Sequence, residues 1–185
     1  MTKFKEHFST GKVIIHTNRH YTGDSDSGDI DLVVFEPKSD CLLIAEVKGF
    51  IHPDSTEEVV QANQKLKKGL EQITRIQDWL NTLDQNEQSS RLGLPNFSRP
   101  PSVEFAVIGN GFVGSDYLCI PDGISIVDAE YLLLPKFKEK SIFDAVHEYQ
   151  KRLLEENAKA DQDFLSSSVT LAGITFELPS WIAAK

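Results

Sequence analysis

The chain has 185 residues, of which 40% are hydrophobic and 25% are charged, and its net charge is −9. These values are ordinary for a globular protein and allow one domain with a substantial core. The excess of acidic residues excludes a protein that attracts polyanions through its overall field. Any contact with nucleic acid must therefore depend on a local basic surface or on bound cations.

The sequence also sets expectations about the compartment. No apolar run approaches the roughly 20 residues of a membrane span, and the first ten residues lack the apolar core of a signal peptide. The two cysteines, Cys41 and Cys119, are too few for a disulfide framework. We therefore expect a cytoplasmic protein without a membrane partner.

In chain order, the pattern begins with a strand over residues 13–15, followed by a polar loop. Residues 27–50 then form a hairpin of two apolar strands. A long amphipathic helix follows, because Ser55 and Glu58 have the spacing of a capping box and the apolar period continues to about Leu83. Its apolar side has one polar member, a glutamine: Val59, Ala62, Leu66, Leu70, Ile73, Gln77 and Leu80.

The second half of the chain continues this alternation of strands and helices. Residues 84–101 are polar and contain prolines, which predicts a long loop. Strands over 103–108 and 124–127, a helix over about 141–160 and a final strand in the tail complete the pattern. This order predicts an α/β fold in which helices flank a mixed β-sheet.

Three short motifs are typical of other chemistry but lack its structural context. The GNGFVG motif at Gly109 follows a strand, as in a nucleotide-binding fold, but the residues before Ile124 leave no room for the phosphate-binding helix. The HTNRH motif at His16 has the histidine spacing of a zinc helix but follows residues that favour a strand. The DSDSG motif at Asp24 lacks the glutamate of a calcium loop. We expect a glycine-rich turn, a solvated strand end and a solvated turn.

The hairpin of residues 27–50 carries charge where a sheet interior would be apolar. If the four residues PKSD form its loop, antiparallel pairing places Asp31 opposite Glu46. The same register places Asp29 opposite Lys48. The period of two puts all four charged side chains on one face of the sheet.

Two carboxylates that face each other on a half-buried sheet repel and destabilise the fold. A salt bridge between Lys48 and one of them offsets part of this repulsion, and a divalent cation offsets it better, because Mg²⁺ takes carboxylate oxygens and keeps several waters. Lys48 would lie about 7 Å along the strand from Glu46, where an ammonium could orient an attacking water. Metal-assisted hydrolysis of a phosphodiester uses such a set of groups.

The segments GDIDLVV and LLIAEVK resemble the PD-(D/E)XK nuclease superfamily, and they are most similar to its nuclease-related-domain and Holliday-junction-resolvase-like branch. The resemblance implies a restriction-endonuclease-like fold formed by one domain over 1–185. Its catalytic core would cover about 11–130, and a C-terminal helix-plus-strand extension would cover about 140–185.

The resemblance also implies roles for individual residues. Asp31 and Glu46 match the ligands of Mg²⁺, for which Mn²⁺ can substitute, and Lys48 matches the lysine that supports the attacking water. Asp29 would be an auxiliary acid. Many members carry a further acidic ligand on a helix before the first strand, where Glu6 is the one candidate, so a fragment of a longer protein is an alternative explanation.

The long helix provides a basic surface that is independent of the motif. Five residues, none of them acidic, fall within a sector of about 80° that is separate from the apolar side: Gln61, Lys65, Lys68, Gln72 and Arg75. Solvation of a helix face is the simpler explanation. In a chain with 28 acidic and 19 basic residues, however, an acid-free stripe suits phosphate contacts. The resemblance implies a glutamine from this helix near the metal, for which we choose Gln72, with Gln61 as the alternative.

Together, the residues and the resemblance predict a Mg²⁺-dependent nuclease that hydrolyses phosphodiester bonds of DNA, with RNA a less favoured substrate. Asp31 and Glu46 would hold the metal, Lys48 and Gln72 would act beside it, and cleavage of both strands would favour a homodimer. One alternative is a catalytically inactive module of the same fold that binds nucleic acid or a partner protein. Another is a nucleotide-binding protein that uses the glycine-rich segment.

Overall fold

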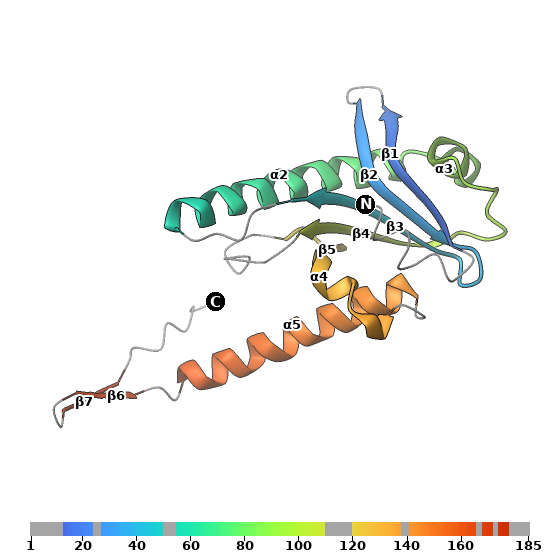
Figure 1. Cartoon of the computed structure of the whole chain (residues 1–185). Coiled ribbons are helices and arrows are strands. Elements are labelled where there is room, and N and C mark those ends of the chain that lie inside the picture. The colour runs from blue at the N-terminus through green and yellow to red at the C-terminus, as the bar shows by residue number, and fades with distance from the viewer. Residues whose placement is uncertain are drawn as a thin grey trace. The chain divides into compact units, whose positions relative to one another are not determined.

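The computed structural model contains a five-stranded sheet with helices on both faces and a separate two-stranded ribbon near the C-terminus (Figure 1). It describes residues 13–23, 27–49, 55–109, 120–137, 141–165, 168–171 and 174–177. The chain divides into two compact units, Met1–His147 and Glu148–Lys185, and each is described by itself.

The strands and the two long helices that the sequence predicts occur in the predicted order among the described residues, but the first strand continues to Thr22 instead of ending at Ile15, and three short helical segments were not predicted. The strands are β1 (Ile14–Thr22), β2 (Ser27–Glu36), β3 (Cys41–Lys48), β4 (Ser102–Gly109), β5 (Ile124–Asp128), β6 (Ser168–Leu171) and β7 (Ile174–Glu177). The helices are α2 (Thr56–Asn81), α3 (Gln85–Leu92), α4 (Ala129–Leu132), the 3₁₀ turn η2 (Pro135–Phe137) and α5 (Ile142–Leu165).

The large sheet has the order β1-β2-β3-β4-β5 and is mixed, as predicted. Strands β1, β2 and β3 pair antiparallel, and β3, β4 and β5 pair parallel. The predicted hairpin register is confirmed over the last five residues of β2, where Val33 pairs with Ile44 and Phe35 with Leu42. The four residues between Glu36 and Cys41 form the turn.

The two faces of the sheet are covered by different helices. Helix α2 lies along one face, and α4, η2 and the beginning of α5 lie on the other (Figure 1). Because side chains alternate along a strand, Phe35, Ile44 and Val107 point to the α2 side and join its core. This arrangement places the end of β3 beside the middle of α2.

Helix α2 forms where the capping box and the apolar period predict it. The Ser55 hydroxyl accepts a hydrogen bond from the Glu58 amide at 3.2 Å and so caps the first turn. The side chains of its predicted apolar side are buried at Ala62, Leu66 and Ile73, and also at two further members, Leu70 and Leu80. The helix ends at Asn81, close to the expected position.

The prediction of a loop over residues 84–101 is wrong in its first half, which forms α3. Asp84 caps this helix, and the side chain of Glu87 accepts a hydrogen bond from the Asp84 amide in a complete capping box. Gly93 ends the helix in the left-handed conformation, with φ of 69°. The capping box and the terminal glycine are both visible in the sequence. The helix was not predicted from them because the residues between are mostly polar and lack the apolar periodicity of a helix.

The C-terminal part differs in detail from its prediction. Helix α5 ends at Leu165, later than expected, and the predicted final strand is the antiparallel ribbon of β6 and β7. None of the helices in the described ranges combines the length and the apolar composition of a membrane span.

The three motifs set aside on sequence grounds are only partly covered by the structure. His16 and His20 lie in strand β1, which confirms that the HTNRH motif does not form a zinc helix. Gly109 ends β4, but residues 110–119 lie outside the described residues, as do residues 24–26 of the DSDSG motif.

Candidate functional site

The site begins where β2 separates from β3. The pairing of these strands stops at Leu32 and Ala45, one residue short of the predicted pair of Asp31 and Glu46. Beyond this point the Asp31 carboxylate accepts a hydrogen bond of 2.9 Å from the backbone amide of Val47. The side chain thus takes the place of a backbone carbonyl as the acceptor. From this point the β1–β2 hairpin turns away from the rest of the sheet (Figure 1).

The pairing with β1 is also interrupted at Asp31. Thr17 pairs with Leu32 and Arg19 with Ile30, but the intervening Asn18 makes no ladder pair with Asp31. Asn18 has φ of 55°, which a few asparagines adopt and which distorts a strand locally. Asp31 is therefore the point at which both neighbouring ladders lapse within the described part of β2.

Glu46 is the most deeply buried charged residue of the described chain, with 1% of its surface exposed. The pKa of its carboxyl is raised to about 7. Burial is the largest cause of this rise, the hydrogen bond and charge of Lys48 oppose it, and the nearby Asp31 carboxylate adds to it. The Oε1 atom is buried and has no hydrogen-bond partner. A buried carboxylate with one oxygen unsatisfied is costly to the fold.

Lys48 connects this carboxylate to helix α2. Its Nζ donates a hydrogen bond of 2.9 Å to Glu46 Oε2 and one of 2.6 Å to Gln72 Oε1. The side chain is 19% exposed, so the pair with Glu46 is largely shielded from solvent. The structure thus brings together four of the residues predicted from the sequence: Asp31, Glu46, Lys48 and Gln72.

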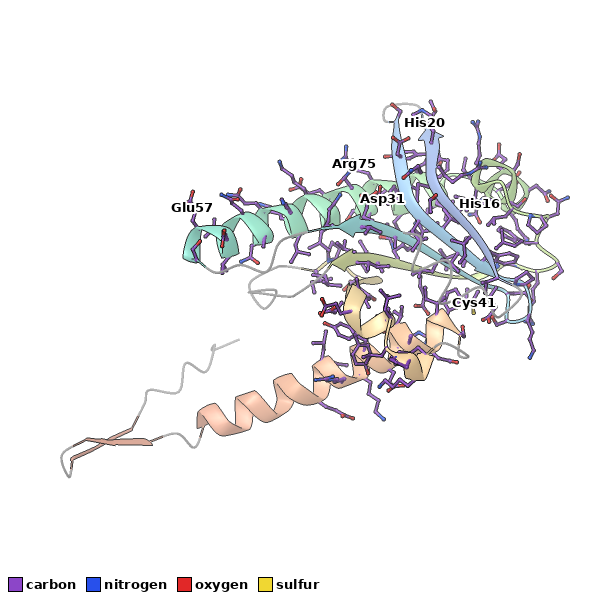
Figure 2. The ribbon with its side chains drawn as sticks, in the orientation of Figure 1. His16, His20, Asp31, Cys41, Glu57 and Arg75 are labelled. Atoms are coloured by element: carbon purple, nitrogen blue, oxygen red, sulfur yellow. The ribbon has the colours of Figure 1, made fainter. Side chains whose placement is uncertain are left out.

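Asp29 does not join this group, and the predicted pairing with Lys48 is wrong. In the structure Asp29 lies opposite His20 in β1, and its Oδ1 is 3.1 Å from His20 Nδ1. Its side chain is 67% exposed. The physical reason is that β2 has already left β3 at this position and follows β1. Figure 2 shows His20 near the projecting end of the β1–β2 hairpin and Asp31 nearer the rest of the sheet.

The basic stripe of α2 lies beside the site. Three basic side chains of this stripe are exposed: Lys65, Lys68 and Arg75. Figure 2 shows Arg75 projecting outward from α2. Gln72 is half-buried between this stripe and Lys48. Gln61 is exposed and eleven residues earlier, about 16 Å along the helix axis, so the geometry favours Gln72 of the two glutamines.

Two features of the site were not predicted from the sequence. One is the backbone amide of Val47, because backbone groups carry no residue-specific signal. The other is Gly69, which is buried within α2 against Lys48. A glycine inside a long helix is visible in the sequence and usually has a packing reason.

The residues present fit a hard divalent cation in part. No group of three or more potential ligands occurs among the described residues, and the predicted third ligand, Glu6, lies outside them. Mg²⁺, however, is commonly held by one or two carboxylates and completes its shell with water. The buried, unpaired Glu46 Oε1 next to the Asp31 carboxylate satisfies this smaller requirement.

A second acid, Glu104, is half-buried on the opposite face of the sheet. Glu104 in β4 is 2.7 Å from Nε2 of His147 in α5, and burial raises the pKa of the Glu104 carboxyl. It points away from Val107 and the α2 core, so it does not contribute to the site of Glu46. It provides a matched comparison for that site.

No model of a protein family matches the chain, and a search of curated proteins finds no significantly similar sequence. The functional assignment therefore depends on the site itself.

Proposed function

We propose that the chain is a divalent-metal-dependent nuclease that hydrolyses phosphodiester bonds of DNA, with a restriction-endonuclease-like fold of the PD-(D/E)XK superfamily. One observation carries the proposal: Glu46 is buried next to Asp31, is bonded to Lys48 through one oxygen, and leaves the other oxygen unpaired. Strongly perturbed carboxyls with a specific charged partner concentrate at functional sites.

A structural role alone explains this group poorly. The fold would be more stable with an apolar residue at position 46, because the carboxylate is desolvated and lies near a second carboxylate. Asp31 and Glu46 would hold the metal, for which Mg²⁺ or Mn²⁺ is suitable. Bound there, the cation would offset the repulsion of the carboxylates and polarise a phosphodiester oxygen.

Lys48 would act on the attacking water and on the phosphate. An ammonium group has three N–H donors, and Glu46 and Gln72 occupy two of them. The third N–H can orient a water or stabilise negative charge on a phosphoryl oxygen. Because two acceptors on different elements hold the ammonium, little reorganisation is needed when the substrate binds.

The basic stripe of α2 would bind the substrate backbone. Lys65, Lys68 and Arg75 project into solvent next to Gln72, so phosphates that contact them would run past Lys48. A local stripe of this kind is required in a chain of net charge −9. The resemblance of the motif to enzymes that cleave DNA makes DNA the first substrate to test, ahead of RNA.

The alternative is an inactive module of the same fold that binds nucleic acid or a partner protein. It is favoured by the presence of only two close carboxylates among the described residues. Incubation of the purified chain with plasmid, short duplexes and RNA in Mg²⁺, Mn²⁺ or EDTA separates the two functions. Cleavage that requires the metal supports the nuclease, whereas binding without cleavage under every condition supports the module.

A further inference from the structure

Gly69 occupies an unfavourable position for its residue type. It lies near the middle of the 26-residue helix α2 and is buried. Glycine destabilises a helix interior relative to alanine because it loses more conformational freedom on folding. Its φ is not in the left-handed region, so the backbone does not require it. The reason for glycine must therefore lie in what surrounds it.

A side chain at position 69 would meet two residues of the sheet. A Cβ atom there would lie 2.9 Å from Val107 Cγ1, 3.1 Å from Lys48 Cε and 3.3 Å from Lys48 Cγ. These separations are shorter than the 3.5–4.0 Å of an optimal contact between carbon atoms. The Cγ and Cε atoms of Lys48 thus lie against the surface that the missing side chain leaves open.

Neither neighbour can move aside without consequence. Val107 is β-branched and fully buried in the sheet. Lys48 is anchored at its end by the hydrogen bonds to Glu46 and Gln72. Gln72 follows Gly69 by three residues, so both lie on the same side of α2. The helix thus offers an open surface for the stem of Lys48 and, one turn later, an acceptor for its ammonium.

We propose that Gly69 is a positioning residue for Lys48: its missing side chain forms a notch through which the lysine reaches the place between Glu46 and Gln72. The structural part of this inference rests on the contacts alone, and its consequence for cleavage rests on the proposed nuclease function. A methyl group in the notch displaces the ammonium from its two acceptors.

Thermal unfolding without metal or nucleic acid tests the structural part. Gly69→Ala is expected to lower the melting temperature in the wild-type background and to lower it less in Lys48→Ala, where the stem is absent. A decrease of the same size in both backgrounds overturns the proposal. The control is Gly49→Ala, since a Cβ at this neighbour of Lys48 meets nothing within 4 Å.

A second comparison covers the case in which Gly69→Ala alone does not fold. Its combinations with Lys48→Ala and with Val107→Ala then decide which contact matters. Recovery of the fold with Lys48→Ala supports the notch. Recovery with Val107→Ala only, or with neither, shows that glycine serves helix–sheet packing and overturns the proposal.

The position of the ammonium gives a direct readout. In NMR spectra of the metal-free protein, the Nζ signal of Lys48, identified by its loss in Lys48→Ala, is expected to shift in Gly69→Ala and to stay unchanged in Gly49→Ala. An unchanged signal in Gly69→Ala overturns the proposal, because a purely structural glycine would not affect this hydrogen bond.

Kinetics connect the notch to the proposed reaction. For DNA cleavage, Gly69→Ala is expected to lower kcat about tenfold or more with KM within about twofold, as for a misplaced catalytic group. If the wild type cleaves DNA and Gly69→Ala has the same kcat, the positioning role of Gly69 is overturned while the nuclease function is not. If no variant cleaves but the unfolding and NMR results hold, the nuclease function fails and the notch stands.

Discussion

The side-chain oxygen of Gln72 accepts a hydrogen bond of 2.6 Å from the ammonium of Lys48, across 24 residues of sequence. This bond joins helix α2 to the end of strand β3. It gives the lysine a second acceptor besides Glu46 and links the basic stripe of the helix to the pair of carboxylates. The proposed site depends on this link, which can be tested at each of its members.

Removal of the Gln72 acceptor should impair cleavage more than stability. Gln72→Ala is expected to lower kcat for DNA about tenfold to a hundredfold, since a hydrogen bond to a charged group contributes about 1.5–3 kcal/mol. The affinity for DNA should change little. Gln64→Ala, an exposed glutamine of the same helix, is the control. Equal kcat values for the two variants would contradict the assignment of Gln72.

Glu46 should make the stability of the metal-free protein depend on pH. Its pKa is about 7 in the fold and 4.5 when unperturbed, so the folded state binds more protons between these values. The free energy of unfolding therefore falls as pH rises from about 4.5 to about 7 and levels off at higher pH. The rise in pKa corresponds to about 3 kcal/mol, which Glu46→Gln should recover at pH 8 and not at pH 4.5.

Urea unfolding in EDTA at several pH values measures this effect. Glu104 should also lower the free energy of unfolding as pH rises, because burial raises the pKa of its carboxyl as well. Glu104→Gln is therefore the matched control. This variant should retain the part of the pH dependence that comes from Glu46. An unaltered pH dependence in Glu46→Gln would show that this carboxyl does not carry the protonation.

Divalent cations should stabilise the fold through Asp31 and Glu46. Binding to the folded state alone, at ten times the dissociation constant, contributes about 1.4 kcal/mol and raises the melting temperature. At pH 8, Mg²⁺ or Mn²⁺ should stabilise the wild type but not Asp31→Asn or Glu46→Gln. Asp29→Asn, which removes an exposed carboxylate two residues from Asp31, should respond like the wild type. Absence of the metal response in Asp29→Asn as well would point to nonspecific binding by surface acids.

The basic stripe of α2 should control the affinity for DNA. Lys68→Gln and Arg75→Gln are each expected to weaken binding for all duplex sequences and to reduce the slope of log K against log salt by about 0.9 for each phosphate that is no longer neutralised. Lys67→Gln is the control, because this exposed lysine lies on the same helix but outside the stripe. Equal salt slopes in titrations of all three variants would contradict the stripe as the DNA-binding surface.

Local pattern was sufficient to predict much of the site. The alternation of apolar residues around a four-residue loop predicts the register that pairs Val33 with Ile44. Helix periodicity groups Gln72 with Lys68 and Arg75 on one side of α2, whereas its choice as the residue beside Lys48 came from the resemblance to the nuclease superfamily. Both inferences use positions close in sequence or within one regular element, where backbone geometry fixes the spacing.

The remaining features depend on contacts between distant elements. Asp29 faces His20 because β2 follows β1 after Asp31, and no pattern within the hairpin indicates where the strands part. The burial of Glu46 likewise depends on α2 covering the end of β3. The reason for a glycine at position 69 becomes apparent only from its contact with Lys48, which lies on a different element.

The most direct test of the proposed nuclease site compares, in one assay, the buried carboxylate of Glu46 with the half-buried carboxylate of Glu104 on the opposite face of the sheet. Plasmid cleavage in Mg²⁺ is measured for the wild type, Glu46→Ala and Glu104→Ala, with folding of each confirmed by circular dichroism. We expect cleavage by the wild type and by Glu104→Ala, and no cleavage by Glu46→Ala. Cleavage that persists in folded Glu46→Ala, or that disappears equally in both variants, would contradict the assignment of Glu46.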